Sequence, residues 1–149
     1  ALDLHERVLA DSERLLGPDH PNTLLARNNL AASYSDAGRT QHALNLHERV
    51  LADSERLLGP DHPNTLLARN NLANSYSAAG RTQDALDLAE RVLADSERLL
   101  GPNHPNTLRA RHNLVHVREA AGAVQQPDTA TPTTDPDHHP PAETPEQPV

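Results

Sequence analysis

Apolar residues recur along the first 16 residues of the chain at helical spacing. They form one wide stripe made of Leu2, Leu4, Val8, Leu9, Leu15 and Leu16. A stripe of this width is typical of an amphipathic helix that buries one face. Gly17 and Pro18 follow it, and this pair ends a helix because Gly adopts the left-handed conformation and Pro cannot continue the helix. The pattern therefore predicts a helix over residues 1–16.

The same alternation of an apolar stripe and a turn signal continues along the chain. It predicts five further helices, over residues 21–37, 40–58, 63–79, 82–100 and 105–121. Gly38 is expected to end the second helix. Asp19 is expected to satisfy the free amides at the start of that helix, and Thr40 to cap the third. Short turns between helices make neighbouring helices antiparallel.

The chain repeats itself with a period of 42 residues. Residues 43–84 differ from residues 1–42 at four places, Asp3/Asn45, Ala32/Asn74, Asp36/Ala78 and His42/Asp84. Residues 85–126 form a third copy that stays close through Thr107 and then drifts. A fixed period in this range is the signature of a solenoid. We therefore predict an all-α solenoid of six helices over residues 1–122, with two full repeats and a half-unit at each end.

The charge of the chain is uneven. The net charge is −8, of which residues 127–149 carry −5 and the three copies −2, −1 and 0. Residues 123–149 are rich in Pro, Thr and acids, which predicts a disordered acidic tail. The near-neutral repeats argue against a nucleic-acid surface. No apolar run approaches the ~20 residues of a membrane span, and no Cys is present.

Several motifs recur in register within the repeats. They are LGPDHPNT at residues 58–65, NNLA at residues 70–73, and the single residues Tyr76, Gly80 and Ala85. Together they resemble the tetratricopeptide repeat of the 42-residue kind found in kinesin light chains and many bacterial relatives. The resemblance covers residue 1 to about 122. It departs from the family at Arg27, Arg69 and Arg111, where large aromatic residues are frequent, so a core poor in large side chains is expected.

The resemblance implies a right-handed superhelix with a concave groove that binds peptides of partner proteins. Family positions that line the groove map onto Leu25, Asn28, Ala32, Ser35, Asp36, Leu67, Asn70, Asn74, Ser77, Ala78, Arg109, His112, His116 and Glu119. Two of the four differences between the first two copies fall in this set, which is what a graded binding surface would show. Drift at exposed positions explains them equally well.

Asn28 and Asn70 are the leading candidates for ligand contact, because an amide can both donate to and accept from a peptide backbone. The alternative is that they face a neighbouring helix. His20, His62 and His104 occur in every turn motif, and we expect a structural role for them. His112 and His116 are four residues apart, the spacing that lets two imidazoles share a metal ion. A polar, partly basic end of the groove is the favoured interpretation.

No enzyme motif is visible, and neither a cofactor nor a metal is expected. The leading hypothesis is a cytoplasmic, bacterial scaffold that binds a protein or peptide partner in the groove. A second is a regulatory arm of a larger signalling NTPase or transcription regulator. This hypothesis fits the start of the pattern at Ala1 in mid-repeat, which favours a fragment of a longer protein. A third is end-to-end self-association of near-identical repeats.

Three expectations concern the ends of the array. Part of the apolar stripe of residues 1–16 should be exposed, because no helix precedes it. Arg118, which stands where Tyr34 and Tyr76 stand in the other copies, should face solvent. The acidic tail could fold back toward Arg109 and the two histidines, although a tail that touches nothing is favoured.

Overall fold

The computed structural model describes residues 2–125, and these residues form six α-helices and no strand. The helices are α1 (Leu2–Leu16), α2 (Pro21–Asp36), α3 (Thr40–Leu58), α4 (Pro63–Ala78), α5 (Thr82–Leu100) and α6 (Pro105–Gln125). Five of them begin and end within one residue of the predicted bounds. Residues 126–149, which hold most of the predicted acidic tail, lie outside the described residues, so the predictions about that tail stay predictions.

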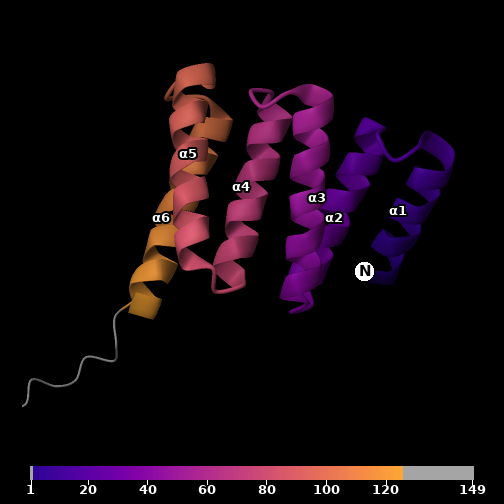
Figure 1. The fold of residues 1–149 in the computed structure, drawn as a ribbon, viewed down its shortest axis with the longest axis horizontal. Coiled ribbons are helices and arrows are strands. Elements are labelled where there is room, and N and C mark those ends of the chain that lie inside the picture. The colour runs from indigo at the N-terminus through magenta and orange to yellow at the C-terminus, as the bar shows by residue number, and fades with distance from the viewer. Residues whose placement is uncertain (1, 126–149) are drawn as a thin grey trace, which may run out of the picture.

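The helices follow one another along the array from α1 to α6, each antiparallel to the next (Figure 1). Turns of three or four residues join them. Each helix packs against its neighbours in sequence, and α4 also packs against α6. This is the predicted solenoid, in which every unit contacts the units next to it rather than distant parts of the chain.

The C-terminal end of α6 departs from the prediction. Gly38 and Gly80 follow α2 and α4 with φ angles of 75° and 78°. Their counterpart Gly122 has no positive φ, and α6 continues through it to Gln125 instead of ending at Ala121. The reason is local, because the Arg-Thr pair that opens α3 and α5 is replaced by Ala-Val after Gly122. Nothing in this stretch disfavours a helix strongly before the next proline.

Alanine substitutions at Gly80 and Gly122 are expected to have opposite effects. Gly80→Ala should destabilise the array by about 1–2 kcal/mol, because a Cβ is disfavoured in the left-handed region. Gly122→Ala should stabilise it by roughly 0.5–1 kcal/mol, because alanine is the better helix former and a Cβ there meets no atom within 4 Å. Urea unfolding of the two variants measures both changes, and effects of the same sign would contradict the different conformations.

Histidine side chains cap α2, α4 and α6. Nδ1 of His20 accepts a hydrogen bond from the backbone N–H of Asn22 at 3.1 Å. Equivalent bonds join His62 to Asn64 and His104 to Asn106. The predicted cap Asp19 is therefore wrong, because its carboxylate pairs with Arg56 at 2.8 Å. Thr40 is also not a cap but the first residue of α3. The recurring histidines have the structural role that we expected.

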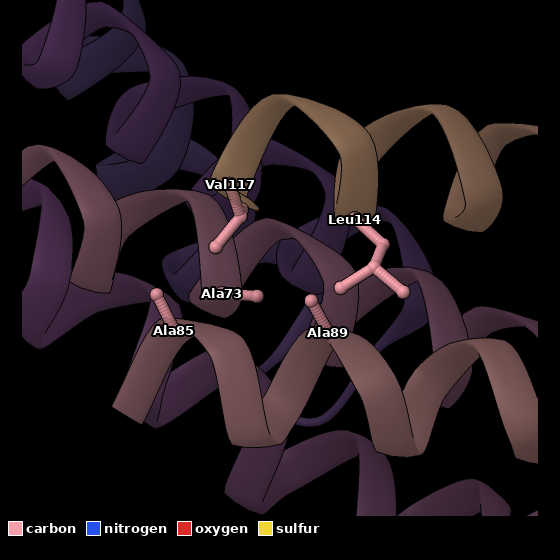
Figure 2. Close-up of a cluster of buried hydrophobic side chains, with 5 residues drawn as sticks. All are labelled: Ala73, Ala85, Ala89, Leu114 and Val117. Carbon is pink, nitrogen blue, oxygen red and sulfur yellow. The ribbon is translucent and has the colours of Figure 1, made fainter. Parts of the chain in front are cut away.

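Small side chains let α4 and α5 approach closely. A buried cluster joins these helices to α6, and it consists of Ala73, Ala85, Ala89, Leu114 and Val117 (Figure 2). Ala73 and Ala85 are 0% exposed, so neither has room for a larger side chain. Leu114 and Val117 project from α6 onto the alanines of the other two helices. The core of each unit is therefore thin and depends on close helix contact.

The two ends of the array agree with the expectations. No residue of α1 is buried, and Leu4, Val8 and Leu15 are 60%, 44% and 69% exposed. Val50, the counterpart of Val8 in α3, is 5% exposed because α2 precedes α3. Arg118 is exposed at the other end, where its guanidinium lies 3.7 Å from Glu90. Both predictions are confirmed.

Arg27 is the largest fully buried side chain among the described residues, with 0% of its surface exposed. Its Nη1 contacts Asp53 of α3 at 2.8 Å, and its Nη2 contacts Glu13 of α1 at 3.2 Å. Arg69 makes the same two contacts one repeat later. A core poor in large side chains was expected at these positions. Instead, each arginine joins three helices through ion pairs and fills the space with its own stem.

Candidate functional site

Helices α2, α4 and α6 line three open hollows. The largest apolar one has a volume of about 510 Å³ and lies between α2, α4 and the end of α3. We call it the apolar hollow. Leu24 and Leu25 of α2, Val50 and Leu57 of α3, and Leu67 of α4 contribute its apolar walls. Leu25 is 58% exposed and Leu57 is 37% exposed, so apolar surface lies open to a ligand at this point.

A second hollow lies between α2 and α4 toward their C-terminal ends. Its volume is about 230 Å³, and we call it the acidic hollow because Asp36 lines it. Its other walls are polar or small, among them Ala32, Ser35 and Asn74. It borders the apolar hollow, since Asn28 and Asn71 line both.

A third hollow lies between α4 and α6 and has a volume of about 550 Å³. His112 and His116 line it from α6, and Asn74, Ser77 and Ala78 line it from α4. We call it the histidine hollow. Both histidines are exposed, and their spacing of four residues places them on one face of α6. No group of three or more His, Cys, Asp or Glu residues that could hold a metal ion occurs in residues 2–125.

Most of the predicted groove residues come together around these hollows. Eleven of the fourteen line one of the three: Leu25, Asn28, Ala32, Ser35, Asp36, Leu67, Asn74, Ser77, Ala78, His112 and His116. Asn70 and Arg109 line a fourth, nearly closed space of about 10 Å³. Glu119 is exposed but lines none of the four. The eleven residues that line the open hollows thus share one face, which we call the groove face.

The paired asparagines form hydrogen bonds from one repeat to the next. Asn71 of α4 donates to Oδ1 of Asn28 at 3.1 Å, and Asn113 of α6 donates to Oδ1 of Asn70 at 2.8 Å. Asn70 is 5% exposed, so the expectation that it faces a ligand needs correction. It packs between α4 and α6 because these helices lie in direct contact. Asn28 is half-buried and stays at the edge of two hollows.

The groove face changes its charge from α2 to α6. At the α2 end, Asp36 is exposed and makes no ion pair within the described residues. Asp19 is also there, and its hydrogen bond from Arg56 holds its pKa below the usual range. At the α6 end lie Arg109, His112 and His116, all exposed. The face therefore offers an acidic group at one end and basic groups at the other.

His47 closes the inner side of the acidic hollow. It is 7% exposed, its Nδ1 lies in a hydrogen bond with Ser75, and burial lowers its pKa to about 4. A buried histidine with a lowered pKa is neutral at pH 7 and resists protonation as the pH falls. The corresponding position in α5 is Ala89.

The stability of the array should therefore depend on pH through His47. Below about pH 6.5, His47 binds a proton in the unfolded chain but stays neutral in the folded chain. The free energy of unfolding should therefore fall as the pH drops from about 6.5 to about 4. We expect a loss on the order of 3 kcal/mol over this range. Urea unfolding at several pH values should show it in the unmodified chain. His47→Ala, which copies Ala89, should flatten this part of the profile. An unchanged profile in the variant would contradict the assignment.

The part of the apolar hollow that sequence reasoning missed is its α3 wall. Val50, Ser54 and Leu57 belong to a second helix of a repeat, and the resemblance assigned the groove to first helices alone. The one signal in the sequence is the spacing of Val50, Ser54 and Leu57, which lie four and three residues apart and so share one helix face. Among the described residues, no helix is long and apolar enough to cross a membrane.

Comparisons with known proteins agree with this architecture. Residues 1–22, 23–64 and 65–106 each match the family model described as tetratricopeptide repeat. The solved repeats of a kinesin light chain-like protein from Podosopora anserina, described as nearly identical TPR-like repeats, are 34% identical with a TM-score of 0.67. That match covers 83% of this chain and 59% of the other. A point variant of the same repeats gives 34% identity, a TM-score of 0.69 and coverage of 83% and 58%.

BtubC (BKLC) from P. vanneervenii is 25% identical with a TM-score of 0.70, over 83% of this chain and 50% of that one. The chain therefore spans between half and three-fifths of the solved chains that it matches. A comparison with the curated proteins found no match. The repeats and their neighbours are those of a protein-interaction scaffold, a fold that typically has no catalytic role. On the family model and the arrangement of its six helices, the chain belongs to the tetratricopeptide repeat family.

Proposed function

We propose that the chain binds a segment of a partner protein on the groove face. The observation that carries this proposal is the opening of three hollows, with volumes of about 510, 230 and 550 Å³, between the first helices of successive repeats. The apolar hollow has the size, the mostly apolar walls and the few polar groups that are usual for ligand sites. The differences Ala32/Asn74 and Asp36/Ala78 between near-identical repeats lie in these hollows.

The asparagine bond between α2 and α4 supports a peptide ligand. It uses Nδ2 of Asn71 and Oδ1 of Asn28. Nδ2 of Asn28 and Oδ1 of Asn71 make no side-chain hydrogen bond within the described residues. One donor and one acceptor are therefore available side by side, which suits the alternating groups of a peptide backbone.

A selection experiment tests this proposal. Random 12-residue peptides displayed on phage are selected against the chain, and the dissociation constants of the recovered peptides are measured by fluorescence anisotropy. Asn74→Arg places a long cation between the acidic and histidine hollows, and it should weaken binding by about tenfold or more. Ala52→Arg adds the same side chain at an exposed site of α3 outside the hollows, and it should have no effect. Recovered peptides that are indifferent to Asn74→Arg would contradict the proposal.

Self-association is the second candidate, favoured by the exposed Leu4, Val8 and Leu15 of α1. In such a stack α6 of one copy would precede α1 of the next, as α4 precedes α5. The residue of α6 that would enter this contact is Val115, at the position of the fully buried Ala73. Its added bulk opposes close packing. Light scattering should therefore find one copy at low micromolar concentration, and a mass that rises with concentration would favour the stack.

The regulatory arm of a signalling NTPase or transcription regulator is a special case of the first proposal. It requires the same peptide or domain contact on the groove face, made within a longer protein. A phosphate-binding loop in the sequence upstream of Ala1 would support it. The experiments on the groove face apply to both cases.

A further inference from the structure

Two equivalent spaces along the groove face have very different volumes. The apolar hollow between α2 and α4 measures about 510 Å³, and the closed space between α4 and α6 measures about 10 Å³. Each residue that lines the closed space is the counterpart, 42 positions later, of a residue that lines the apolar hollow. These are Leu66, Leu67, Asn70, Val92, Ser96, Asn106 and Arg109. The chain thus contains an open and a closed version of one site.

The two versions differ at a single lining position. Leu67 in the apolar hollow corresponds to Arg109 in the closed space, and all other paired lining residues are identical. The lining leucines are also more exposed in the open version than in the closed one. Leu24 in the open version is 8% exposed and its counterpart Leu66 is 1% exposed, while α4 lies directly against α6. The open hollow is therefore a particular property of the interval between α2 and α4.

The same interval carries the acidic group of the groove face. Asp36 lines the acidic hollow, and its counterpart in the next interval is Ala78. Asp36 lies 11 residues after Leu25 in α2, which is about 16 Å along the helix. Asn28 and Asn71 lie between them and border both hollows. The apolar hollow and the acidic hollow together form one continuous site, which we call the α2–α4 furrow.

We propose that the α2–α4 furrow binds an extended peptide segment that carries a large apolar side chain and, about five residues away, a Lys or Arg. This inference rests on the proposed function and names the chemistry of the ligand. The apolar side chain enters the apolar hollow, and the cation reaches Asp36. Five residues of extended chain span about 16 Å at 3.3 Å each, which matches the separation along α2. The amides of Asn28 and Asn71 face the backbone between the two anchors.

The negative charge of Asp36 favours a ligand that carries a Lys or Arg over an acidic ligand. Asp36 attracts a cation and repels an acid. Residues 126–149 of the chain carry five acids and no Lys or Arg, so this segment is a poor match for the furrow. The closed space beside Arg109 has no room for an apolar anchor. Among the described residues, the furrow between α2 and α4 is the one place on the groove face where an open apolar hollow and an acid adjoin.

The test uses two substitutions that copy the next repeat. Leu67→Arg introduces the residue found at position 109, and Asp36→Ala introduces the residue found at position 78, so both side chains are already accommodated at equivalent places. Peptides recovered from the random 12-residue library are measured against the unmodified chain and both variants. Arg49→Ala, at an exposed site of α3, is the control. Circular dichroism confirms that every variant is folded.

We expect the recovered peptides to share an apolar residue and a Lys or Arg four to six positions away. Leu67→Arg and Asp36→Ala should each weaken their binding by about tenfold or more, and Arg49→Ala should leave it unchanged. Added salt should weaken binding to the unmodified chain more than to Asp36→Ala. Peptides that lose affinity with Asn74→Arg but not with Leu67→Arg or Asp36→Ala would overturn this inference and leave the proposed function standing. Recovery of no peptide would overturn both.

Discussion

Arg27→Ala is expected to lower the free energy of unfolding by about 3–4 kcal/mol. The guanidinium of Arg27 is fully buried and lies 2.8 Å from Asp53 and 3.2 Å from Glu13. Removing it leaves Glu13 without an ion-pair partner among the described residues and leaves Asp53 with Arg56 alone, at 3.3 Å. It also leaves a cavity where the largest buried side chain stood. Both effects weaken the contacts of α2 with α1 and α3.

Arg111 provides the matched control, because it occupies the same position in α6. Its side chain is 47% exposed and, among the described residues, pairs with Glu97 alone. Arg111→Ala should therefore cost less than about 1 kcal/mol. Arg27→Met keeps most of the side-chain volume but removes the charge. It therefore separates the cost of the cavity from the cost of losing the ion pairs. Equal losses at Arg27 and Arg111 in urea unfolding would contradict the structural role of the buried arginine.

Ala73→Leu is expected to cost about 2–3 kcal/mol. Ala73 of α4 is 0% exposed, and it packs against α5 and α6 in the cluster of Figure 2. A leucine there must push Ala85 and Ala89 away, because the close approach of α4 and α5 leaves no space. The loss should appear as a lower urea midpoint with an unchanged slope.

Val115 is the counterpart of Ala73 in α6, and it is 48% exposed. Val115→Leu should change the stability by less than about 0.5 kcal/mol. The comparison separates burial from sequence context, since both residues follow the same Asn-Leu pair. A large loss at Val115 would mean that this position contacts a further surface, such as a second copy of the chain.

The 42-residue period made most of the fold predictable. Gly-Pro pairs and apolar stripes are local signals, so five helices were placed within one residue. The cap at His20 was missed because Asp19 is the stronger cap former in isolation, while the structure uses Asp19 to pair with Arg56. The burial of Arg27 was missed because it depends on acids 14 and 26 residues away. Such contacts have no local pattern in the sequence.

The groove face was predicted residue by residue from the family resemblance, and eleven of fourteen positions line open hollows. The volumes of the hollows could not be predicted in the same way. Asn28 and Asn70 have the same neighbours in sequence, yet Asn70 is buried and Asn28 is half-buried. The difference arises because α4 lies directly against α6, while an open hollow separates α2 from α4. Repeat similarity alone does not report that spacing.

The central claim is that a partner peptide binds on the face made by α2, α4 and α6. The most direct test is a map of backbone amide NMR shifts in the chain, recorded with and without a peptide recovered from the random library. We predict that the changes concentrate around Asn28, Asn71, Asn74 and His116, which line the hollows. Changes confined to the outer surfaces of α1, α3 and α5 would contradict the claim.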